Sequence, residues 1–329
     1  MNELIVSSSP HSKDHRNIST VMGCVLIALV PTIVGAVVYF GWKALLLLAV
    51  SVLSCVLFEY LYNLLLKRQQ TIHDCSAIVT GVLLALNLPV TAPVWLPPIG
   101  ALFAIVVIKM LYGGLGKNLF NPAIAGRIFL FLSFSSLMSN CWTTPFDGVS
   151  SATPLQFLKN ASGELVNIAD HFTIGDCFLG NIGGCIGETS AALLLLGGGY
   201  LLYKRIITWH IPVAFIGTVA LITFVFPRHQ DIDAWQFMLY QITSGGLFLG
   251  AFFMATDYTT SPITPVGRII YGIGCGLLTV FIRYFGGYPE GVSFAILIMN
   301  FFAGFIDQKT IPNRFGGEHH VLRKKRTKN

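Results

Sequence analysis

The chain has 329 residues, of which 54% are hydrophobic and only 11% are charged. A soluble domain carries about 25% charged residues, so this composition excludes an ordinary soluble enzyme and indicates a membrane protein. The net charge of +6 comes largely from a basic tail, which bears on membrane topology and gives no reason to expect a nucleic-acid partner.

The apolar residues gather into ten segments, several of which reach the length of about 20 residues that a bilayer requires. The segments cover residues 17–40, 44–66, 77–88, 95–112, 123–139, 182–202, 207–226, 237–256, 267–284 and 291–306. Tryptophans lie at or near several of their ends, as expected of side chains that anchor a helix at the membrane interface. The pattern predicts an all-α polytopic membrane protein with about ten transmembrane helices.

The basic residues are divided unequally between the two sides of this predicted bundle. With the N-terminus in the cytoplasm, the inside loops and the tail hold Lys13, Arg16, Lys67, Arg68, Lys117, Lys204, Arg205, Arg268, Lys309, Arg314, Arg323, Lys324, Lys325, Arg326 and Lys328. The outside holds only Lys43, Lys159, Arg228 and Arg283. Because cytoplasmic loops are enriched in Lys and Arg, we expect both termini in the cytoplasm and the polar loop 140–181 outside.

The predicted segments divide as five plus five, and because five is odd the second half would be inverted relative to the first. The regions are a cytoplasmic N-terminal segment 1–16, a first five-helix repeat 17–139, an extracytoplasmic loop 140–181, a second five-helix repeat 182–306 and a basic cytoplasmic tail 307–329. In the first half the third segment is short and ends at Asn87-Leu88-Pro89, and in the second half it runs through Ser244-Gly245-Gly246 and stops near Thr256-Asp257. Such matched interruptions point to a binding site near the membrane midplane. The alternative is that Gly and Pro are simply commoner in membrane helices.

The seven cysteines form no CxxC pair, so neither a zinc site nor an iron–sulfur site is expected, and no other metal site is predicted. Most of them are expected to be small buried apolar residues. Cys141 and Cys177 flank the outer loop and could form a disulfide if that loop faces an oxidising compartment.

One stretch of the outer loop, residues 147–155, combines turn residues with an accessible threonine. Taken by itself, this stretch predicts only a loop. It also resembles the recognition sequence of flavin transferases, Asp-x-x-Ser/Thr-Gly/Ser-Ala-Thr, in which an FMN phosphate is joined to the threonine hydroxyl as a phosphoester. The matching residues are Asp147, Ser150, Ala152 and Thr153, and Ser151 stands where glycine is frequent.

Further segments in chain order resemble one family, the D subunits of the Rnf complex. That complex is the ferredoxin:NAD oxidoreductase of bacterial membranes, and its D subunit is related to the B subunit of the sodium-pumping NADH:quinone oxidoreductase. The segments are Ser9-Pro10-His11 and residues 74–81, 113–122, 187–190 and 254–257. The resemblance covers the whole chain and implies a fold similar to that of urea transporters, with two inverted repeats.

The resemblance implies a membrane subunit that couples electron transfer to the translocation of Na⁺ or H⁺ across the bacterial inner membrane. FMN would be bound covalently to Thr153, which is then an attachment point and not a nucleophile, and this chain alone would have no catalytic residue. Its partners would be the A, B, C, E and G subunits, a flavin transferase and the lipid bilayer. Because the sequence has neither a dinucleotide fingerprint nor an iron–sulfur pattern, NAD and ferredoxin must meet other subunits.

A second flavin, riboflavin, is implied at a pair of asparagines, Asn118 and Asn121. Their spacing would place both amides on one face of a helix. The alternative role for these residues is helix capping and turn formation before Pro122.

Five ionisable residues lie within or at the edges of the predicted spans: Glu59, Lys109, Arg127, Glu188 and Asp257. Such residues are costly in lipid and are functional candidates by default. Lys109 and Glu59 could instead extend toward the interface, because they lie near span ends. Glu188 and Asp257 are the candidates for a cation or proton path, or for contact with the second flavin.

Two other functions are consistent with the helical pattern. A secondary transporter or channel of the urea-transporter type would move a small polar solute, but it has no need of the loop motif that ends at Thr153. A structural membrane scaffold would explain the spans but neither that motif nor the buried acids.

Overall fold

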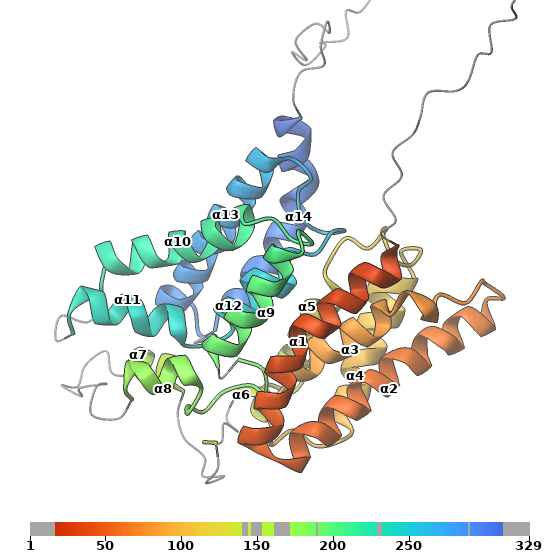
Figure 1. Cartoon of the computed structure of the whole chain (residues 1–329), viewed down its shortest axis with the longest axis horizontal. Helices are drawn as coiled ribbons and strands as arrows, with labels where there is room; N and C mark the ends of the chain where they lie inside the picture. Colours follow the sequence, from red (N-terminus) through yellow and green to blue (C-terminus); the bar gives the residue numbers. More distant parts are fainter. Residues whose placement is uncertain are drawn as a thin grey trace, which may run out of the picture.

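The computed structural model describes residues 17–139, 144–145, 153–160, 172–188, 190–228, 232–288 and 290–311. Within these ranges the protein is built of helices and contains no strand longer than a single bridge (Figure 1). The first half contains α1 (Ile18–Phe40), α2 (Trp42–Leu65), a 3₁₀ turn (Ile72–Asp74), α3 (Ser76–Leu86), α4 (Leu96–Leu102), a π-helix (Phe103–Met110), α5 (Pro122–Ser133) and α6 (Ser135–Ser139).

The second half follows two short helices, α7 (Pro154–Asn160) and α8 (Ile174–Leu179). It contains α9 (Ala191–Tyr203), α10 (His210–Val225), α11 (Ala234–Thr243), α12 (Leu247–Leu249), a second π-helix (Gly250–Met254), α13 (Pro265–Phe285) and α14 (Val292–Thr310). Every predicted apolar segment thus overlaps a helix.

Four of the described helices, α1, α2, α13 and α14, are long and apolar enough to cross a membrane. The helix pair Ala234–Thr243 and Leu247–Met254, bent by 60°, could be a fifth crossing. Fewer than a third of the residues in the most apolar windows of α1 and α2 are buried, 22% and 28% respectively. The apolar side chains that remain exposed on these helices are suited to contact with lipid.

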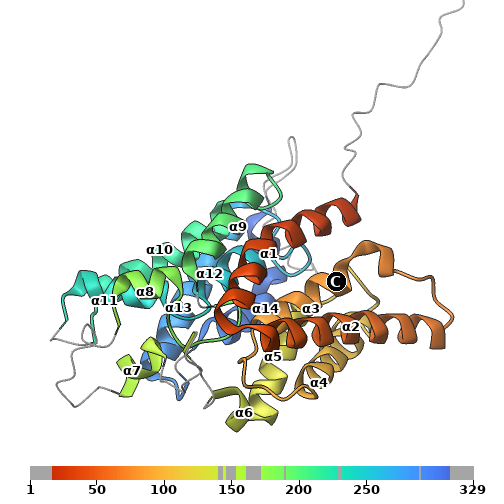
Figure 2. The same cartoon turned by 60° about the horizontal axis from the view of Figure 1, so that its bottom comes forward.

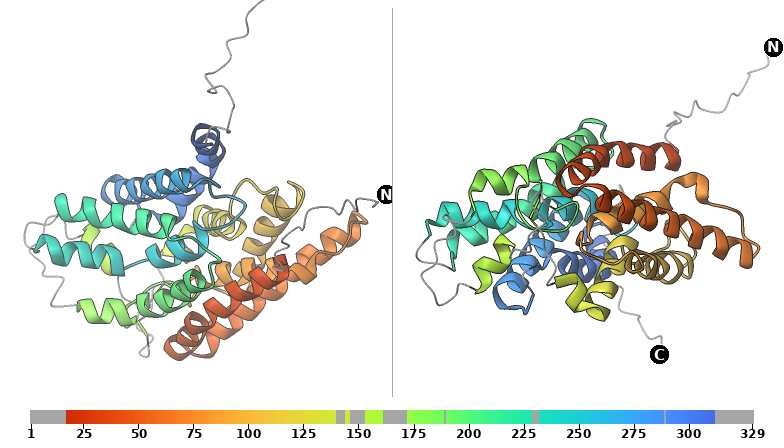
Figure 3. Two further views of the ribbon diagram at one scale, coloured as in Figure 1. Left: turned by 45° about the horizontal axis from the view of Figure 1, so that its top comes forward. Right: turned by 90° about the horizontal axis from the view of Figure 1, so that it is seen from below.

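The two halves pack against each other through α1 with α9 and through α5 with α14, while α1 and α2 lie together along one edge (Figures 2 and 3). The contact of α1 with α9 depends on a small residue. A Cβ atom at Gly197 would lie 2.2 Å from the carbonyl oxygen of Ala28. Small residues let membrane helices approach in this way.

Each half contains a short helix, a break and then a π-helix. In the first half the break after α3 leaves helix-end carbonyls that need partners. Residues of the second half supply them: the N–H of Gly187 donates to Leu86 O at 2.8 Å, and that of Ile186 donates to Leu88 O at 3.0 Å. In the second half the break lies at Ser244-Gly245-Gly246, where Gly245 has φ +74°.

One predicted segment, 182–202, begins its helix later than expected. Its first residues make the irregular connection that pairs with the end of α3, so α9 starts only at Ala191. Ser190 is its N-cap, and its hydroxyl accepts from Leu193 N. Glu188 therefore lies outside a helix.

Candidate functional site

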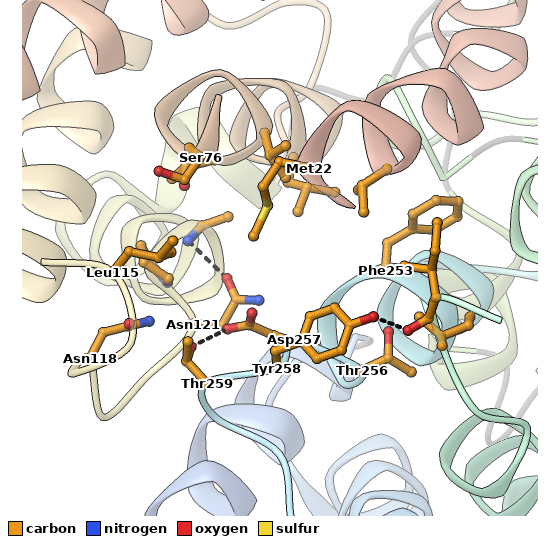
Figure 4. Close-up of a pocket in the computed structure, with 18 of the residues that line it drawn as sticks. Met22, Ser76, Leu115, Asn118, Asn121, Phe253, Thr256, Asp257, Tyr258 and Thr259 are labelled. Atoms are coloured by element: carbon orange, nitrogen blue, oxygen red, sulfur yellow. Dashed lines mark hydrogen bonds between the residues drawn. The ribbon is translucent and has the colours of Figure 1, made fainter. Parts of the chain in front are cut away.

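A pocket lies where the two halves meet, at the ends of both π-helices (Figure 4). Its volume is about 70 Å³, and it adjoins a wider pocket of about 680 Å³, with which it shares Met22, Leu115 and Tyr258. We call the two together the inner pocket, because the loops that line it are those predicted to face the cytoplasm. It combines apolar walls with a few convergent polar groups, as ligand sites commonly do.

Asn121 both caps a helix and joins the two halves. Its Oδ1 accepts from Ala123 N at 3.0 Å and from Ile124 N at 3.4 Å, which caps α5. Its Nδ2 donates to Met254 O at 3.2 Å, in the second π-helix. Residues 118–121 are not helical, so the pair does not share a helical face; both asparagines nevertheless line the inner pocket.

Asn118 differs from Asn121 because half of its amide is unused. Its Nδ2 donates to Phe120 O at 3.2 Å, but its Oδ1 is buried and has no hydrogen-bond partner among the described residues. A buried acceptor without a partner is costly, and a ligand N–H could satisfy it. Figure 4 shows Asn118 on the loop at one side of the pocket, with Asn121 and Asp257 nearer the middle of the view.

Asp257 lines the inner pocket from the second half. Its carboxylate accepts hydrogen bonds from the hydroxyls of Thr259 at 2.9 Å and Thr260 at 3.2 Å. No basic side chain pairs with it within the described part of the chain. The carboxylate is therefore held by neutral groups and is available to a cation.

A buried ion pair forms another wall of the inner pocket. Lys109 Nζ lies 2.7 Å from Glu59 Oε2 and donates to Ser76 Oγ at 2.7 Å, while Thr71 donates to the other carboxylate oxygen. Lys109 and Glu59 are 2% and 0% exposed. Neither side chain extends to the membrane interface, although their positions near the span ends made this possible. The first π-helix places Lys109 in this position, and π-helices often occur at functional sites.

Thr153 lies at a second, smaller pocket, together with Gly183, Gly245, Glu188 and Glu290. The sequence suggested an accessible threonine, but the residue is 6% exposed because its hydroxyl packs at the start of α7 and accepts from Gln156 N at 3.2 Å. The remaining motif residues, Asp147, Ser150 and Ala152, lie outside the described residues, as does Cys141.

A buried ionic cluster borders this pocket. Arg127 Nη1 lies 2.8 Å from Glu188 Oε1, and Arg127 Nη2 pairs with Glu290. Asn87 and Ser293 also accept from Arg127, each at 2.8 Å. Glu188 and Asp257 therefore occupy different sites. Sequence reasoning missed Glu290, since nothing local marks it as the partner of an arginine 163 positions earlier.

The fold and its sites define a class of protein: a helical membrane protein with two broken segments and, between its halves, a pocket that combines apolar walls with a few polar groups. More particularly, the chain belongs to the NQR2, RnfD, RnfE family, whose sequence profile matches residues 5–316.

Curated relatives match nearly the whole chain. It is 45% identical over 320 residues to the D subunit of the Na⁺-translocating ferredoxin:NAD⁺ oxidoreductase complex of Acetobacterium woodii, covering 96% of this chain and 97% of the relative. It is 41% identical over 322 residues to the D subunit of the proton-translocating ferredoxin:NAD⁺ oxidoreductase complex of Clostridium ljungdahlii, with the same coverage. The D subunit of the ion-translocating oxidoreductase complex of Stutzerimonas stutzeri is 39% identical, covering 91% and 92%.

Proposed function

We propose that this chain is the D subunit of an ion-translocating ferredoxin:NAD⁺ oxidoreductase complex. The observation that carries the proposal is the similarity, over nearly the full length of both chains, to relatives named as that subunit. The protein would lie in the bacterial inner membrane with both termini in the cytoplasm and would assemble with the A, B, C, E and G subunits. The names of these two relatives differ in the ion, so Na⁺ and H⁺ are both retained.

The proposed architecture is ten spans in two inverted repeats, 17–139 and 182–306, arranged as in urea transporters. The outer loop 140–181 and the terminal segments complete the chain. Support comes from the same sequence of elements in both halves: a short helix, a break and a π-helix whose end lines the inner pocket. Two related halves would thus each contribute one wall of one site.

FMN is proposed at Thr153, attached by a flavin transferase through a phosphoester. Support comes from the position of Thr153, which lines a small pocket of about 10 Å³ together with Gly183, Gly184 and Gly245. The isoalloxazine ring would supply the redox chemistry. Covalent attachment would keep that ring at one site irrespective of the free flavin concentration.

Riboflavin is proposed in the inner pocket. The volume of about 680 Å³ falls within the usual range for small-molecule sites of roughly 300–1,000 Å³. The unsatisfied Oδ1 of Asn118 matches an N–H donor such as that of the flavin ring. Asn121 would contribute mainly by fixing the loop, since its own amide is already bonded on both sides.

Asp257 and Glu188 remain the proposed ion-path residues, with different roles. Asp257 faces the inner pocket without a basic partner among the described residues. Glu188 pairs with Arg127 beside Thr153, so its neutralisation would also disturb the proposed FMN site. We therefore expect Asp257→Asn to reduce ion transport more selectively than Glu188→Gln does.

The proposal is tested by flavin fluorescence of the denatured protein band. Thr153→Ala should abolish the fluorescence, whereas Ser151→Ala should leave it unchanged, and mass spectrometry should find the FMN increment on the peptide containing Thr153. Thr153→Ser keeps a hydroxyl and controls for folding. An unmodified Thr153 in protein from the native organism would contradict the flavin assignment and favour a solute channel.

A further inference from the structure

Three basic side chains from separate elements line one pocket near α7. They are Lys159 of α7, Arg228 after α10 and Arg283 near the end of α13. Only four basic residues of the chain are assigned to the outer side, and these are three of them, the fourth being Lys43. Positive charge is disfavoured in outer loops, so three basic side chains at one outer pocket are suited to an anionic ligand.

Arg283 gives the clearest evidence, because it is buried and forms no ion pair with a carboxylate among the described residues. Its Nη1 donates to Gln241 O at 2.6 Å and Gln241 Oε1 at 3.0 Å, and Nη2 donates to Ser244 O at 3.4 Å. Its Nε is buried with no partner. The acids of this region, Glu188 and Glu290, form their ion pairs with Arg127 and reach Arg283 only through the field of their nearby charge. Neutral carbonyls orient a guanidinium but do not neutralise its charge.

The other two cations lie at the rim and also donate to backbone carbonyls. Lys159 Nζ donates to Tyr288 O at 2.8 Å and to Gly286 O, and Arg228 Nη1 donates to Tyr284 O. Burial, and then the nearby charge of Arg228, lower the pKa of Lys159 from its ordinary value. An anion in the pocket would reverse the second effect, because it would offset the repulsion between the two cations.

We propose that Lys159, Arg228 and Arg283 form a binding site for a phosphate-type oxyanion. Guanidinium groups match such oxyanions by paired, charge-assisted hydrogen bonds, and the unused Nε–H of Arg283 is available for one. We call this the basic pocket.

Two sources of phosphate fit the location. Leu155 lines both the basic pocket and the pocket of Thr153, so a phosphodiester on that threonine would lie close by. The headgroup of an anionic phospholipid is the other source, because the site is at the predicted outer end of membrane-length α13. The basic pocket itself does not depend on the flavin proposed at Thr153; only the first source does.

The site is tested with inorganic phosphate as the probe and the full-length chain in detergent, by titration calorimetry. The starting protein carries Thr153→Ala, so that no tethered phosphodiester competes. Lys159→Gln combined with Arg228→Gln should weaken phosphate binding by about tenfold or more, since hydrogen bonds to charged groups are being removed. Lys43→Gln is the matched control, an outer basic residue away from the pocket, and should change nothing. Both substitutions are at the rim and leave buried Arg283 in place.

Failure to bind phosphate, or equal weakening by Lys43→Gln, would overturn the site. The source is then identified with the unsubstituted Thr153. Loss of phosphate binding in the flavin-bearing chain assigns the pocket to the tethered phosphodiester. If the flavin-bearing chain still binds phosphate in detergent and in phosphatidylcholine nanodiscs but not in phosphatidylglycerol nanodiscs, the basic pocket is assigned to a lipid headgroup. If neither the tethered flavin nor phosphatidylglycerol removes phosphate binding, the result supports the site and overturns both sources. If Thr153 carries no flavin, the Thr153→Ala protein and the unsubstituted protein should bind phosphate equally well. The flavin proposal would then fail while the basic pocket stands.

Discussion

Asn118 and Asn121, three positions apart, use their side-chain amides differently. Asn121 uses its oxygen to cap α5 and its nitrogen to contact the second π-helix, so its interactions are internal to the protein. Asn118 leaves a buried oxygen without a partner. Of the two alternatives raised by the sequence, capping is observed for Asn121, and ligand binding stays a prediction for Asn118.

Alanine substitutions should separate these roles. Asn121→Ala should lower stability by about 1 kcal/mol through loss of the cap, and Asn121→Ser should recover most of it. Asn118→Ala should leave the unfolding temperature nearly unchanged and reduce non-covalent flavin, measured by chromatography of the acid extract. Normal flavin content in the Asn118 variant would show that its oxygen is not part of the binding site.

The Lys109–Glu59 pair gives a second prediction at this scale. Lys109→Met removes the counter-ion of a fully buried carboxylate and should destabilise the protein by about 3–5 kcal/mol. Combining it with Glu59→Gln should restore much of that loss, because no buried charge is left unpaired. Thermal unfolding of the single and double variants measures the coupling. Additive losses would mean that the two residues do not act as a pair.

Sequence reasoning reached individual residues unevenly. The motif around Thr153 and the asparagine pair each consist of residues that are close together in the sequence, so the sequence alone could indicate them. The pairing of Arg127 with Glu188 and Glu290 was not, because it depends on how α5 packs against α14 and against the connection before α9. The basic pocket is likewise formed by side chains from three distant elements.

At the scale of helices, apolar runs predicted where the elements lie but not how they end. The run 123–139 is divided into α5 and α6, and the run 182–202 becomes a helix only from Ala191. The breaks were visible from Gly and Pro, whereas the π-helices were not. A π-helix has no sequence signature of its own and is fixed by packing.

Helix contacts provide a prediction with a built-in control on α9. Gly197→Ala places a Cβ atom against the backbone of Ala28, and α1 must move away, so the variant should unfold at a lower temperature. Gly199→Ala meets no atom within 4 Å and should raise stability by up to about 1 kcal/mol, as alanine favours helix. A Gly197 variant as stable as the Gly199 variant would contradict the observed contact.

For the whole molecule, the topology is the main untested prediction, and two exposed lysines can test it. Lys43 lies in the first turn of α2, and Lys117 lies in the loop before α5. Lys43→Cys should react with a membrane-impermeant maleimide in right-side-out vesicles, and Lys117→Cys only in inside-out vesicles. The unsubstituted chain gives the background from native cysteines. The reverse labelling pattern would mean that the protein has the opposite orientation in the membrane.

Helix α13 has one pocket at each end: Arg268 lines the inner pocket, and Arg283 lines the basic pocket close to Thr153. The two arginines are separated by roughly 22 Å along the helix axis, a large part of a bilayer. An electron passing inward between flavins bound near these ends would therefore move through the membrane's electric field. With the cytoplasm negative, a full crossing is opposed by about 2.3 kcal/mol per 100 mV. The redox step would then respond to membrane voltage even before any ion is bound.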